Sequence, residues 1–268
     1  MRIGFVQLRP TLADVDTTME EIERLSEQFR SADLVVLPEL CNSGYNFDSL
    51  EQAQATAGNA QHGDFVKYLL ALSKRHNQYI VSGINERDGE SGLLYNSAVL
   101  VGPQAHVGVY RKLHLFMREK DFFEPGNLGL PVFDIGLCRV GILICFDWIF
   151  PEAWRVLALK GADIVCHPAN LVIPGHAQRA VPVHAVMNHI FIVTANRIGQ
   201  ERDLTFTGLS TIANPKGEVL AQASETETEV RIVEIDIAMA RNKAITPRND
   251  VLADRRPEEY TELTRPRG

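Results

Sequence analysis

The sequence predicts an α/β fold in which stacked sheets are covered by helices. Short apolar runs typical of strands alternate along the chain with segments whose apolar residues recur at helical spacing. Other strand-like runs follow one another directly, joined by turn signals such as Asn-Pro-Lys-Gly at 214–217, which indicates antiparallel pairing. Because these antiparallel elements are interleaved with the α/β alternation, we expect stacked sheets with helical layers outside them, and not a plain Rossmann unit.

In the first half of the chain, helical periodicity and breaker residues delimit the expected elements. Residues 15–30 carry four apolar side chains at helical spacing, after Asp and Thr residues that can cap a helix. Pro38 stops the apolar run at 33–37, and the Gly-Pro pair at 102–103 turns the chain between two strands. We expect strands at 2–8, 33–37, 79–84, 93–101 and 106–112, and helices at 15–30 and 63–76.

The second half continues the alternation and then becomes more strand-rich. Pro151 suits the first position of a helix, and Gly161 suits the position just after its end. Alternating polar and apolar residues at 230–237 are typical of a half-buried strand. We expect strands at 139–145, 163–167, 190–196, 207–213, 218–223 and 230–237, and helices at 151–160 and 182–189.

Composition indicates one globular unit. The 268 residues are 45% hydrophobic and 23% charged, which is ordinary for a globular protein, and no repeat or flexible linker divides them. We therefore expect a single domain over residues 1–268. Residues 240–268 are rich in Arg, Pro and Glu and have too few apolar side chains for a core of their own. We expect this C-terminal tail to pack on a neighbour.

Charge and cysteine spacing exclude several classes of protein. The formal net charge is −7 with no basic stripe, which argues against binding to nucleic acid or to an anionic membrane. No apolar run approaches the roughly 18 residues of a membrane-spanning helix. A strand-like run directly after Met1 predicts no signal peptide. The four cysteines lack Cys-x-x-Cys spacing, which favours free thiols in a reducing, cytoplasmic setting.

Histidine spacing predicts no metal site. The chain contains no His-Glu-x-x-His motif. His184 and His189 are not at the i, i+4 spacing that places two zinc ligands on one helix face. We expect neither a metal nor another cofactor.

Three reactive side chains stand where expected strands end. Glu39 follows the run at 33–37, Lys112 closes the run at 106–112, and Cys145 closes the run at 139–145. Strand ends are where reactive groups converge in layered α/β folds. A carboxylate, an ammonium group and a thiol are sufficient for acyl transfer, as base, oxyanion stabiliser and nucleophile. Cys145 also precedes a helical pattern, and a helix N-terminus would favour its thiolate form.

Taken singly, each of these residues also has an ordinary structural interpretation. Glu39 is compatible with a loop carboxylate and Lys112 with a solvated strand end. Most free cysteines are small buried apolar residues, which is an alternative for Cys145 and the better interpretation of Cys41 and Cys166. Glu119, in a loop after Lys112, is a fourth candidate.

Longer motifs around these residues resemble the nitrilase superfamily of carbon–nitrogen hydrolases. The three blocks are Leu-Pro-Glu-Leu at 37–40, Tyr-Arg-Lys-Leu-His-Leu-Phe at 110–116, and Gly-Ile-Leu-Ile-Cys-Phe-Asp-Trp-Ile-Phe-Pro-Glu at 141–152. Four shorter matches occur at 95–98, 123–126, 161–164 and 167–170. The resemblance covers residues 1 to about 240, with compact microbial nitrilases and amidases as the most similar members.

The resemblance implies a fold, a site and a reaction. The fold is a four-layer αββα sandwich, usually paired into a homodimer or a higher homo-oligomer. In the site, Glu39 is the general base, Lys112 stabilises the oxyanion, Cys145 is the nucleophile, and Glu119 positions the substrate and the lysine. The reaction is hydrolysis of a non-peptide carbon–nitrogen bond in a small amide or nitrile through a cysteine thioester, which releases ammonia and a carboxylic acid.

Four further residues are candidates for substrate binding. Tyr45 and Trp148 each lie a few residues past a member of the triad and would form an apolar wall around a small substrate. The backbone N–H of Phe146, directly after the nucleophile, would be a second oxyanion donor. Asn170 follows another strand end and could exchange a hydrogen bond with the substrate.

Other functions compete with this interpretation. An N-carbamoyl amino acid or amine hydrolase would use the same triad. A papain-like hydrolase would instead pair Cys145 with His184 or His189. A binding or regulatory module that kept the fold is a third alternative, against which the presence of Glu39, Lys112 and Cys145 argues.

Overall fold

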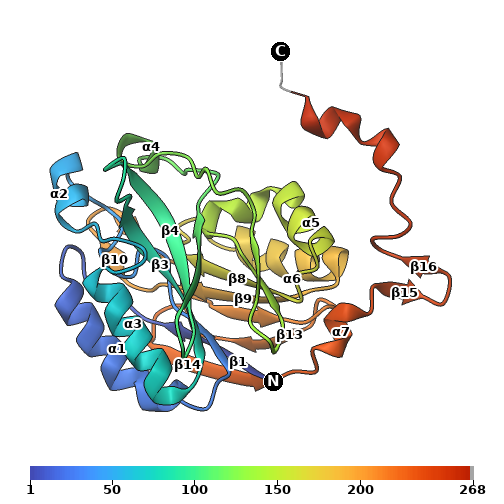
Figure 1. Ribbon diagram of the computed structural model, residues 1–268, viewed down its shortest axis with the longest axis horizontal. Coiled ribbons are helices and arrows are strands. Elements are labelled where there is room, and N and C mark those ends of the chain that lie inside the picture. Colours follow the sequence, from blue (N-terminus) through green and yellow to red (C-terminus); the bar gives the residue numbers. More distant parts are fainter. Residues whose placement is uncertain (266–268) are drawn as a thin grey trace.

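The computed structural model describes residues 1–265 and contains two six-stranded sheets stacked face to face (Figure 1). The first sheet has the order β14-β1-β2-β3-β4-β5 and the second the order β13-β12-β9-β8-β7-β6. Each sheet has a parallel centre, β1-β2-β3 and β7-β8-β9, with antiparallel strands at its edges. This mixed pattern confirms the stacked sheets that the sequence predicts.

The strand boundaries of the first sheet are β1 (Arg2–Gln7), β2 (Leu34–Val36), β3 (Tyr79–Arg87), β4 (Leu94–Val101), β5 (His106–Arg111) and β14 (Glu229–Glu234). Those of the second are β6 (Val132–Asp134), β7 (Arg139–Ile142), β8 (Ile164–Ala169), β9 (Phe191–Asn196), β12 (Thr211–Ala213) and β13 (Val219–Gln222). Two short hairpins lie outside the sheets, β10 (Gln200–Glu201) with β11 (Leu204–Thr205) and β15 (Ala244–Thr246) with β16 (Asn249–Asp250).

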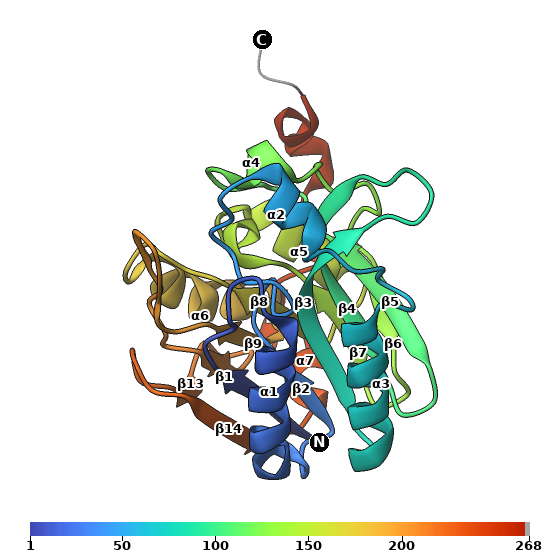
Figure 2. The same ribbon diagram turned by 90° about the vertical axis from the view of Figure 1, so that its left-hand side faces the viewer.

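Four helices form the outer layers. The first sheet is covered by α1 (Val15–Phe29) and α3 (Asp64–His76), and the second by α5 (Pro151–Leu159) and α6 (His176–Asn188) (Figure 2). The shorter helices are α2 (Leu50–Ala55), α4 (Glu119–Phe122) and α7 (Ala238–Arg241), and the 3-10 turns are η1 (Cys145–Ile149), η2 (Pro257–Glu259) and η3 (Thr261–Thr264). The order of layers, helix–sheet–sheet–helix, is that of an αββα sandwich.

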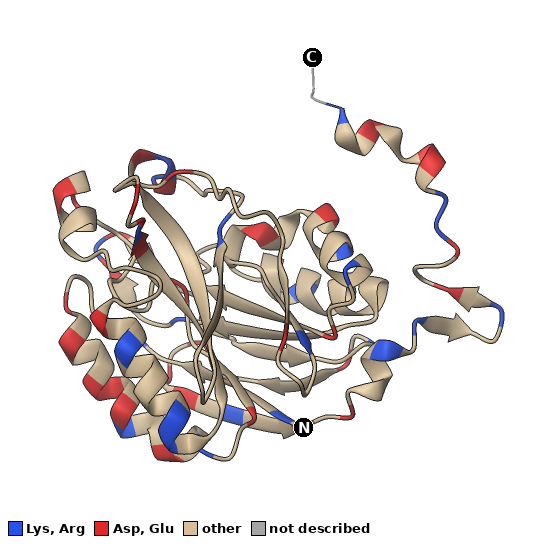
Figure 3. Ribbon diagram, in the orientation of Figure 1, with Lys and Arg blue, Asp and Glu red and all other residues tan. Residues whose placement is uncertain are grey.

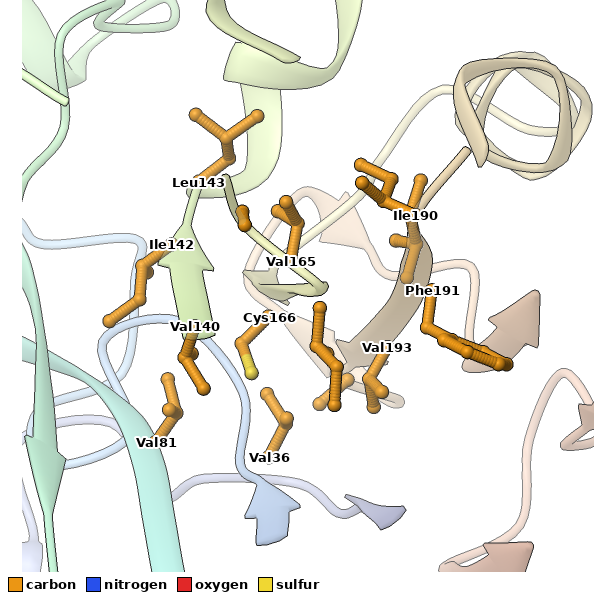
Figure 4. Packing of buried hydrophobic residues seen from close by; sticks show 14 of the residues in the cluster. Val36, Val81, Val140, Ile142, Leu143, Val165, Cys166, Ile190, Phe191 and Val193 are labelled. Carbon is orange, nitrogen blue, oxygen red and sulfur yellow. The ribbon is translucent and has the colours of Figure 1, made fainter. Parts of the chain in front are cut away.

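Alternation along the strands determines which layer each side chain joins. In β2, Leu34 and Val36 point towards the second sheet, while Val35 points towards α1 and α3. Figure 4 shows Val36 and Val81 of the first sheet facing Val140 of the second. Figure 3 shows many Lys, Arg, Asp and Glu residues on α1 and α3, the helices outside the first sheet. The apolar interior between the sheets therefore sets their separation and holds their ends in line.

Local signals explain the helix ends. The Asp14 side chain accepts a hydrogen bond from Thr17 N and caps α1, Pro151 opens α5, and Gly161 follows its end with φ of 83°. The expectation for 182–189 is wrong at its start, because α6 begins at His176 and contains Pro182. The helix extends past the proline because the preceding turns bury Ala177 and Val181 in the core, which offsets one missing hydrogen bond.

The strand expected at 139–145 is also wrong at one end. β7 stops at Ile142, and Cys145 opens the 3-10 turn η1 with a left-handed φ of 42°. The apolar character of residues 143–144 reflects burial in a turn rather than pairing in a sheet, since both are fully buried. The expected strand at 207–213 is shortened to β12, and the one at 230–237 corresponds to β14, which runs from Glu229 to Glu234.

The C-terminal segment leaves the body of the molecule after α7 and extends through β15, β16, η2 and η3 (Figure 1). Ile245 and Leu263 in this segment have 57% and 63% of their surface exposed. The prediction that residues 240–268 pack on a neighbour stays a prediction for the described part, and residues 266–268 lie outside the described residues. No helix within residues 1–265 has the length and apolar character needed to cross a membrane.

Gly83 of β3 is a point at which the fold leaves no room for a side chain. A β-carbon built there would lie 2.3 Å from the Glu39 Cα, which is far below van der Waals contact. We predict that Gly83→Ala lowers the free energy of unfolding by roughly 1–3 kcal/mol, as overpacking does in other cores. Denaturant titration measures the change.

Gly58→Ala is the matched control, because a β-carbon there meets nothing nearer than 3.9 Å. An equal loss of stability in the two variants would contradict the close packing of 37–41 against β3.

Candidate active site

Glu39 is carried to the site by a segment that leaves β2 and crosses over β3. Leu37 N donates to Val81 O at 2.8 Å, Gly83 N donates to Pro38 O at 3.0 Å, and Cys41 N donates to Gly83 O at 2.9 Å. These bonds place the backbone of Glu39 directly over Gly83, which explains the close approach at that glycine. The Glu39 side chain is fully buried.

Lys112 reaches the same end of the first sheet from β5. β2 and β3 are parallel, and β4 is antiparallel to both β3 and β5, so β5 runs in the direction of β2. Glu39 and Lys112 therefore both follow strand ends on one edge of the sheet. Asn96 of β4 joins them, because its carbonyl accepts from Lys112 N at 2.8 Å and its Nδ2 donates to Glu39 Oε1 at 2.8 Å.

The Lys112 ammonium group lies between two carboxylates. Its Nζ donates to Glu39 Oε1 at 2.8 Å and to Glu119 Oε1 at 2.7 Å, and none of its surface is exposed. Glu119, the first residue of α4, also accepts from the Tyr45 hydroxyl at 2.8 Å and from Phe116 N at 3.2 Å. The structure thus brings together Glu39, Lys112 and Glu119 from three separate segments. Glu119 belongs to a short helix, and not to a loop as expected.

The charges in this cluster depend on one another. Burial opposes a charge on Lys112, but Glu119 and Glu39 outweigh it and raise the pKa of the ammonium group above its ordinary value. Burial, together with the negative charge of Glu39, raises the pKa of Glu119 to about 7. The positive charge of Lys112 opposes this increase but does not cancel it. The lysine therefore stays protonated, and Glu119 titrates near neutral pH.

Cys145 lies beyond the end of β7, in the turn η1, which two buried side chains hold in place. Asp147, fully buried, accepts from Ile144 N at 2.9 Å and from the Tyr110 hydroxyl at 2.7 Å. The ring of His167 bonds the Cys145 carbonyl through Nε2 at 2.9 Å. These bonds hold the residue in its left-handed conformation, which costs a non-glycine residue about 1–2 kcal/mol.

The Cys145 thiol is protonated at rest. Burial, and then the negative charge of Glu39, raise its pKa well above the ordinary value, and the opposing charge of Lys112 does not cancel these effects. The expectation of a thiolate favoured by a helix N-terminus is therefore wrong. Cys145 sits in η1, and α5 begins only at Pro151, so burial beside carboxylates decides the state of the sulfur.

A small apolar cavity of about 20 Å³ opens beside Cys145 and is lined by Phe116, Cys145, Phe146, Trp148, Asn170, Leu171, Val172 and Ile173. A second cavity of about 70 Å³ is lined by Tyr45, Phe116 and Glu119 among others. Glu39 Oε2 and Asn170 Oδ1 are buried and have no hydrogen-bond partner within residues 1–265. Unpartnered buried acceptors cost free energy, so a bound molecule would be expected to use them.

The four residues predicted to bind substrate all lie at these two cavities. Phe146, Trp148 and Asn170 line the one at Cys145, and Tyr45 lines the other. Asn170 Nδ2 donates to the Glu39 carbonyl at 3.1 Å, which ties this side chain to the backbone of Glu39. The Tyr45 hydroxyl is already engaged by Glu119, so this side chain is more than an apolar wall.

The histidines of the papain-like alternative take part in other contacts. His184 stacks on Trp154 with ring centroids 4.9 Å apart, and His189 Nδ1 bonds the Asn242 carbonyl at 2.9 Å. Across residues 1–265 no histidine side chain hydrogen-bonds to the Cys145 sulfur. His167 contacts only the backbone of that residue, and burial lowers its pKa to about 4, so the ring is neutral.

Sequence reasoning missed three residues that shape the site, namely Asn96, Asp147 and His167. Each is a polar residue inside a buried segment, and each is at most 1% exposed. Buried polar side chains nearly always satisfy a specific partner, so a polar residue inside an apolar run was the available signal. Cys41, Cys138 and Cys166 are free and buried, as structural thiols are. In the described chain, no group of three or more His, Cys, Asp or Glu side chains is placed to hold a metal ion.

Comparison with known proteins gives a family for this arrangement. A sequence model described as "Carbon-nitrogen hydrolase" matches residues 2–244. The chain is 49% identical to a nitrilase of Pyrococcus abyssi over 97% of this chain and 99% of that protein. It is 29% identical to the N-carbamoylputrescine amidase of Arabidopsis thaliana over 93% and 91% of the two chains.

Solved structures of amidases have the same fold as this chain. An amidase from Nesterenkonia sp. superposes with a TM-score of 0.81 at 25% identity, over 98% of this chain and 96% of that one. A variant of the Nesterenkonia sp. amidase shows covalent addition of the acetamide moiety of fluoroacetamide at its active-site cysteine. The fold is therefore the four-layer sandwich of the nitrilase superfamily, and the chain is an enzyme that belongs to the carbon–nitrogen hydrolase family.

Proposed function

We propose that this hydrolase cleaves small, uncharged amides or nitriles, with Cys145 as nucleophile, Glu39 as general base and Lys112 as oxyanion stabiliser. The observation that carries the proposal is the buried Lys112 ammonium group, which donates to Glu39 at 2.8 Å and to Glu119 at 2.7 Å. The charges of all three groups act on the Cys145 thiol. A protonated lysine that cannot leave its partners is a fixed positive charge aimed at a site of bond formation.

In the first step, the Cys145 thiol transfers its proton to Glu39 as sulfur attacks the substrate carbonyl carbon. Because the thiol is protonated at rest, proton transfer has to accompany the attack. Glu39 Oε2 is buried without a partner, which supports it as the proton acceptor. The carbonyl oxygen becomes an oxyanion, stabilised by the Lys112 ammonium group and by Phe146 N–H.

In the second step, the tetrahedral adduct collapses, the carbon–nitrogen bond breaks, and Glu39 returns the proton to the departing nitrogen. Ammonia leaves, and the acyl group remains on Cys145 as a thioester. Water then gives one proton to Glu39 and attacks the thioester, and the proton returns to the sulfur as the acid is released. A nitrile would pass through a thioimidate, and its hydrolysis and loss of ammonia would give the same thioester.

The cavity at Cys145 supports a small and uncharged substrate. Its lining contains aromatic and aliphatic side chains and one amide, but no charged group. An N-carbamoyl amino acid or diamine carries a carboxylate or an ammonium group, which would need a partner of opposite charge there. At the Cys145 cavity this lining favours simple amides and nitriles over the N-carbamoyl alternative, whereas the second cavity, which Tyr45 lines, contains the charged side chains of Arg118, Glu119 and Asp203.

Removing Lys112 tests the catalytic assignment. We predict that Lys112→Ala lowers kcat/KM for a short aliphatic amide by roughly 100- to 1,000-fold or more, because the oxyanion loses its charged donor. Cys145→Ala should abolish ammonia release altogether. The measurement is ammonia release from a panel of short amides, nitriles and N-carbamoyl amino acids.

His184→Gln is the control for the papain-like alternative and is expected to keep most of the activity. Full activity in Lys112→Ala would overturn the triad. If His184→Gln also lost its activity, the papain-like alternative would be favoured.

The pKa of Glu119 predicts the acid limb of the pH profile. As pH falls through about 7, this carboxylate takes up a proton and Lys112 loses one of its two anionic partners. We therefore predict that kcat/KM is constant above this value and declines below it. In Glu119→Gln, which has no group to titrate at this position, the step near neutral pH should be absent. A wild-type profile that stays flat down to pH 5 would contradict the assignment.

The outer helices of the second sheet support a homodimer. On α6, Val183 and Met187 are 53% and 46% exposed, and the extended segment after α7 presents further apolar side chains. Apolar groups on one face, together with a segment that leaves the body, are typical of an interface. We place the protein in the cytoplasm because its four cysteines are free.

Light scattering after size exclusion tests the dimer. We predict a mass of twice 29.9 kDa for the protein, and a monomer for the double variant Val183→Glu with Met187→Glu, because two buried carboxylates would oppose association. Leu93→Glu, at an equally exposed leucine in the β3–β4 turn, should leave the mass unchanged. A monomeric wild-type protein would rule the dimer out.

A further inference from the structure

A second buried ion pair lies outside the proposed chemistry. Arg197 and Glu201 are 0% and 6% exposed, and Arg197 Nη1 contacts Glu201 Oε1 at 2.5 Å. Removing two charges from water costs several kcal/mol per ion, so such a pair is poor support for stability by itself. The groups that this ion pair holds in place therefore indicate its role.

The pair is bonded to the short segment that carries Tyr45. Glu201 Oε2 accepts from Tyr45 N at 3.0 Å and from Asn46 N at 2.8 Å. Gly44, with φ of 74°, leaves the space for this carboxylate, because a β-carbon there would lie 2.8 Å from Glu201 Oε1. Two backbone donors and one glycine are thus arranged around a single buried carboxylate.

Aromatic packing makes a second link between the ion pair and Tyr45. The Arg197 guanidinium lies over the ring of Phe206 at 4.0 Å from its centroid, and Tyr45 meets the same ring edge-on with centroids 5.9 Å apart. The arginine also donates to the Pro10 carbonyl at 3.1 Å, which anchors it to the loop after β1. Both the backbone and the ring of Tyr45 are therefore fixed by groups that the ion pair holds.

The tyrosine in turn contacts the catalytic cluster. Its hydroxyl donates at 2.8 Å to Glu119 Oε1, the same oxygen that accepts the Lys112 ammonium group at 2.7 Å. A shift of the Tyr45 backbone would lengthen the first bond and leave this carboxylate with one fewer donor. The contacts form a continuous path from Arg197 through Glu201, Tyr45 and Glu119 to Lys112.

We propose that the Arg197–Glu201 ion pair is a positioning element of the active site, which fixes Tyr45 so that its hydroxyl holds the Glu119 carboxylate against Lys112. The inference rests on the proposed function, since it gives Tyr45 and the pair a role in that chemistry. Tyr45 then has two roles: it supports the charged cluster through its hydroxyl, and it lines a cavity.

The proposal predicts a change in the pH profile that a merely structural role would not produce. A donor to the charged form of a carboxylate lowers its pKa, so loss of the Tyr45 hydroxyl raises the pKa of Glu119. Tyr45→Phe, which keeps the ring on Phe206, should move the acid limb of kcat/KM to higher pH by roughly one unit. At neutral pH this corresponds to a loss of up to about tenfold in activity.

The ion pair is removed by the double variant Arg197→Met with Glu201→Leu, which leaves neither buried charge unpaired. We expect its acid limb to move in the same direction as that of Tyr45→Phe. When the pair is removed in the Tyr45→Phe background, we expect no further shift, because the hydroxyl through which it acts is gone.

Should the double variant not fold, Glu201→Gln replaces it and is expected to shift the acid limb by a smaller amount. Arg75→Met with Glu23→Leu, which removes an ion pair between the outer helices α1 and α3, is the control with no expected shift.

Two results would overturn the proposal. One is a wild-type pH profile in the ion-pair variant, which would make the pair structural only. The other is a full additional shift in the Tyr45→Phe background, which would mean that the pair acts by another route.

Alkylation of Cys145 by iodoacetamide, with the site identified by peptide mass spectrometry, separates this inference from the proposed function. Its pH dependence also reports the charge of Glu119, which acts on the thiol, and it needs no turnover. If the wild-type protein hydrolysed no substrate, the proposed function would fail, whereas the alkylation profiles would still decide the role of the ion pair.

Discussion

The buried Lys112 ammonium group, shared between Glu39 and Glu119, is the interaction on which the rest of the site depends. An uncompensated charge in this interior would be strongly unfavourable, and two carboxylates with one cation leave one negative charge to be stabilised. The surroundings supply it with donors, Asn96 Nδ2 for Glu39 and the Tyr45 hydroxyl for Glu119. These neighbours explain why so many polar groups are buried at one end of an otherwise apolar sandwich.

The two sheets divide the work of building the site. The first sheet carries Glu39 and Lys112 just past strand ends on one edge, and the second carries Cys145 in the turn η1 that follows β7. The apolar core between the sheets fixes their relative position. The charged cluster and the Cys145 thiol therefore influence one another although they are far apart in the sequence. Figure 4 shows part of this core. Burial raises the pKa of the Cys145 thiol, so in the proposed mechanism the thiol loses its proton as it reacts.

Much of this was predictable from the sequence, and the exceptions have physical reasons. Apolar runs predict most of the strands, and the reactive residues that follow those runs identify Glu39, Lys112 and Cys145 as candidates for the site. Periodicity could not place the end of β7, because buried turn residues are as apolar as strand residues. The local sequence predicts a helix dipole at Cys145, but burial and carboxylates at long sequence separation decide the state of its thiol. The partners Asn96 and Arg197 depend on tertiary contacts that no local pattern encodes.

A crystal structure of Cys145→Ala with a short amide bound would show whether Lys112 holds the substrate oxygen. We expect the substrate carbonyl oxygen to lie within hydrogen-bond distance of Lys112 Nζ, with its carbon next to residue 145 and Lys112 still paired with both carboxylates. A substrate oxygen bound elsewhere, or a Lys112 side chain turned away from Glu39 and Glu119, would contradict it.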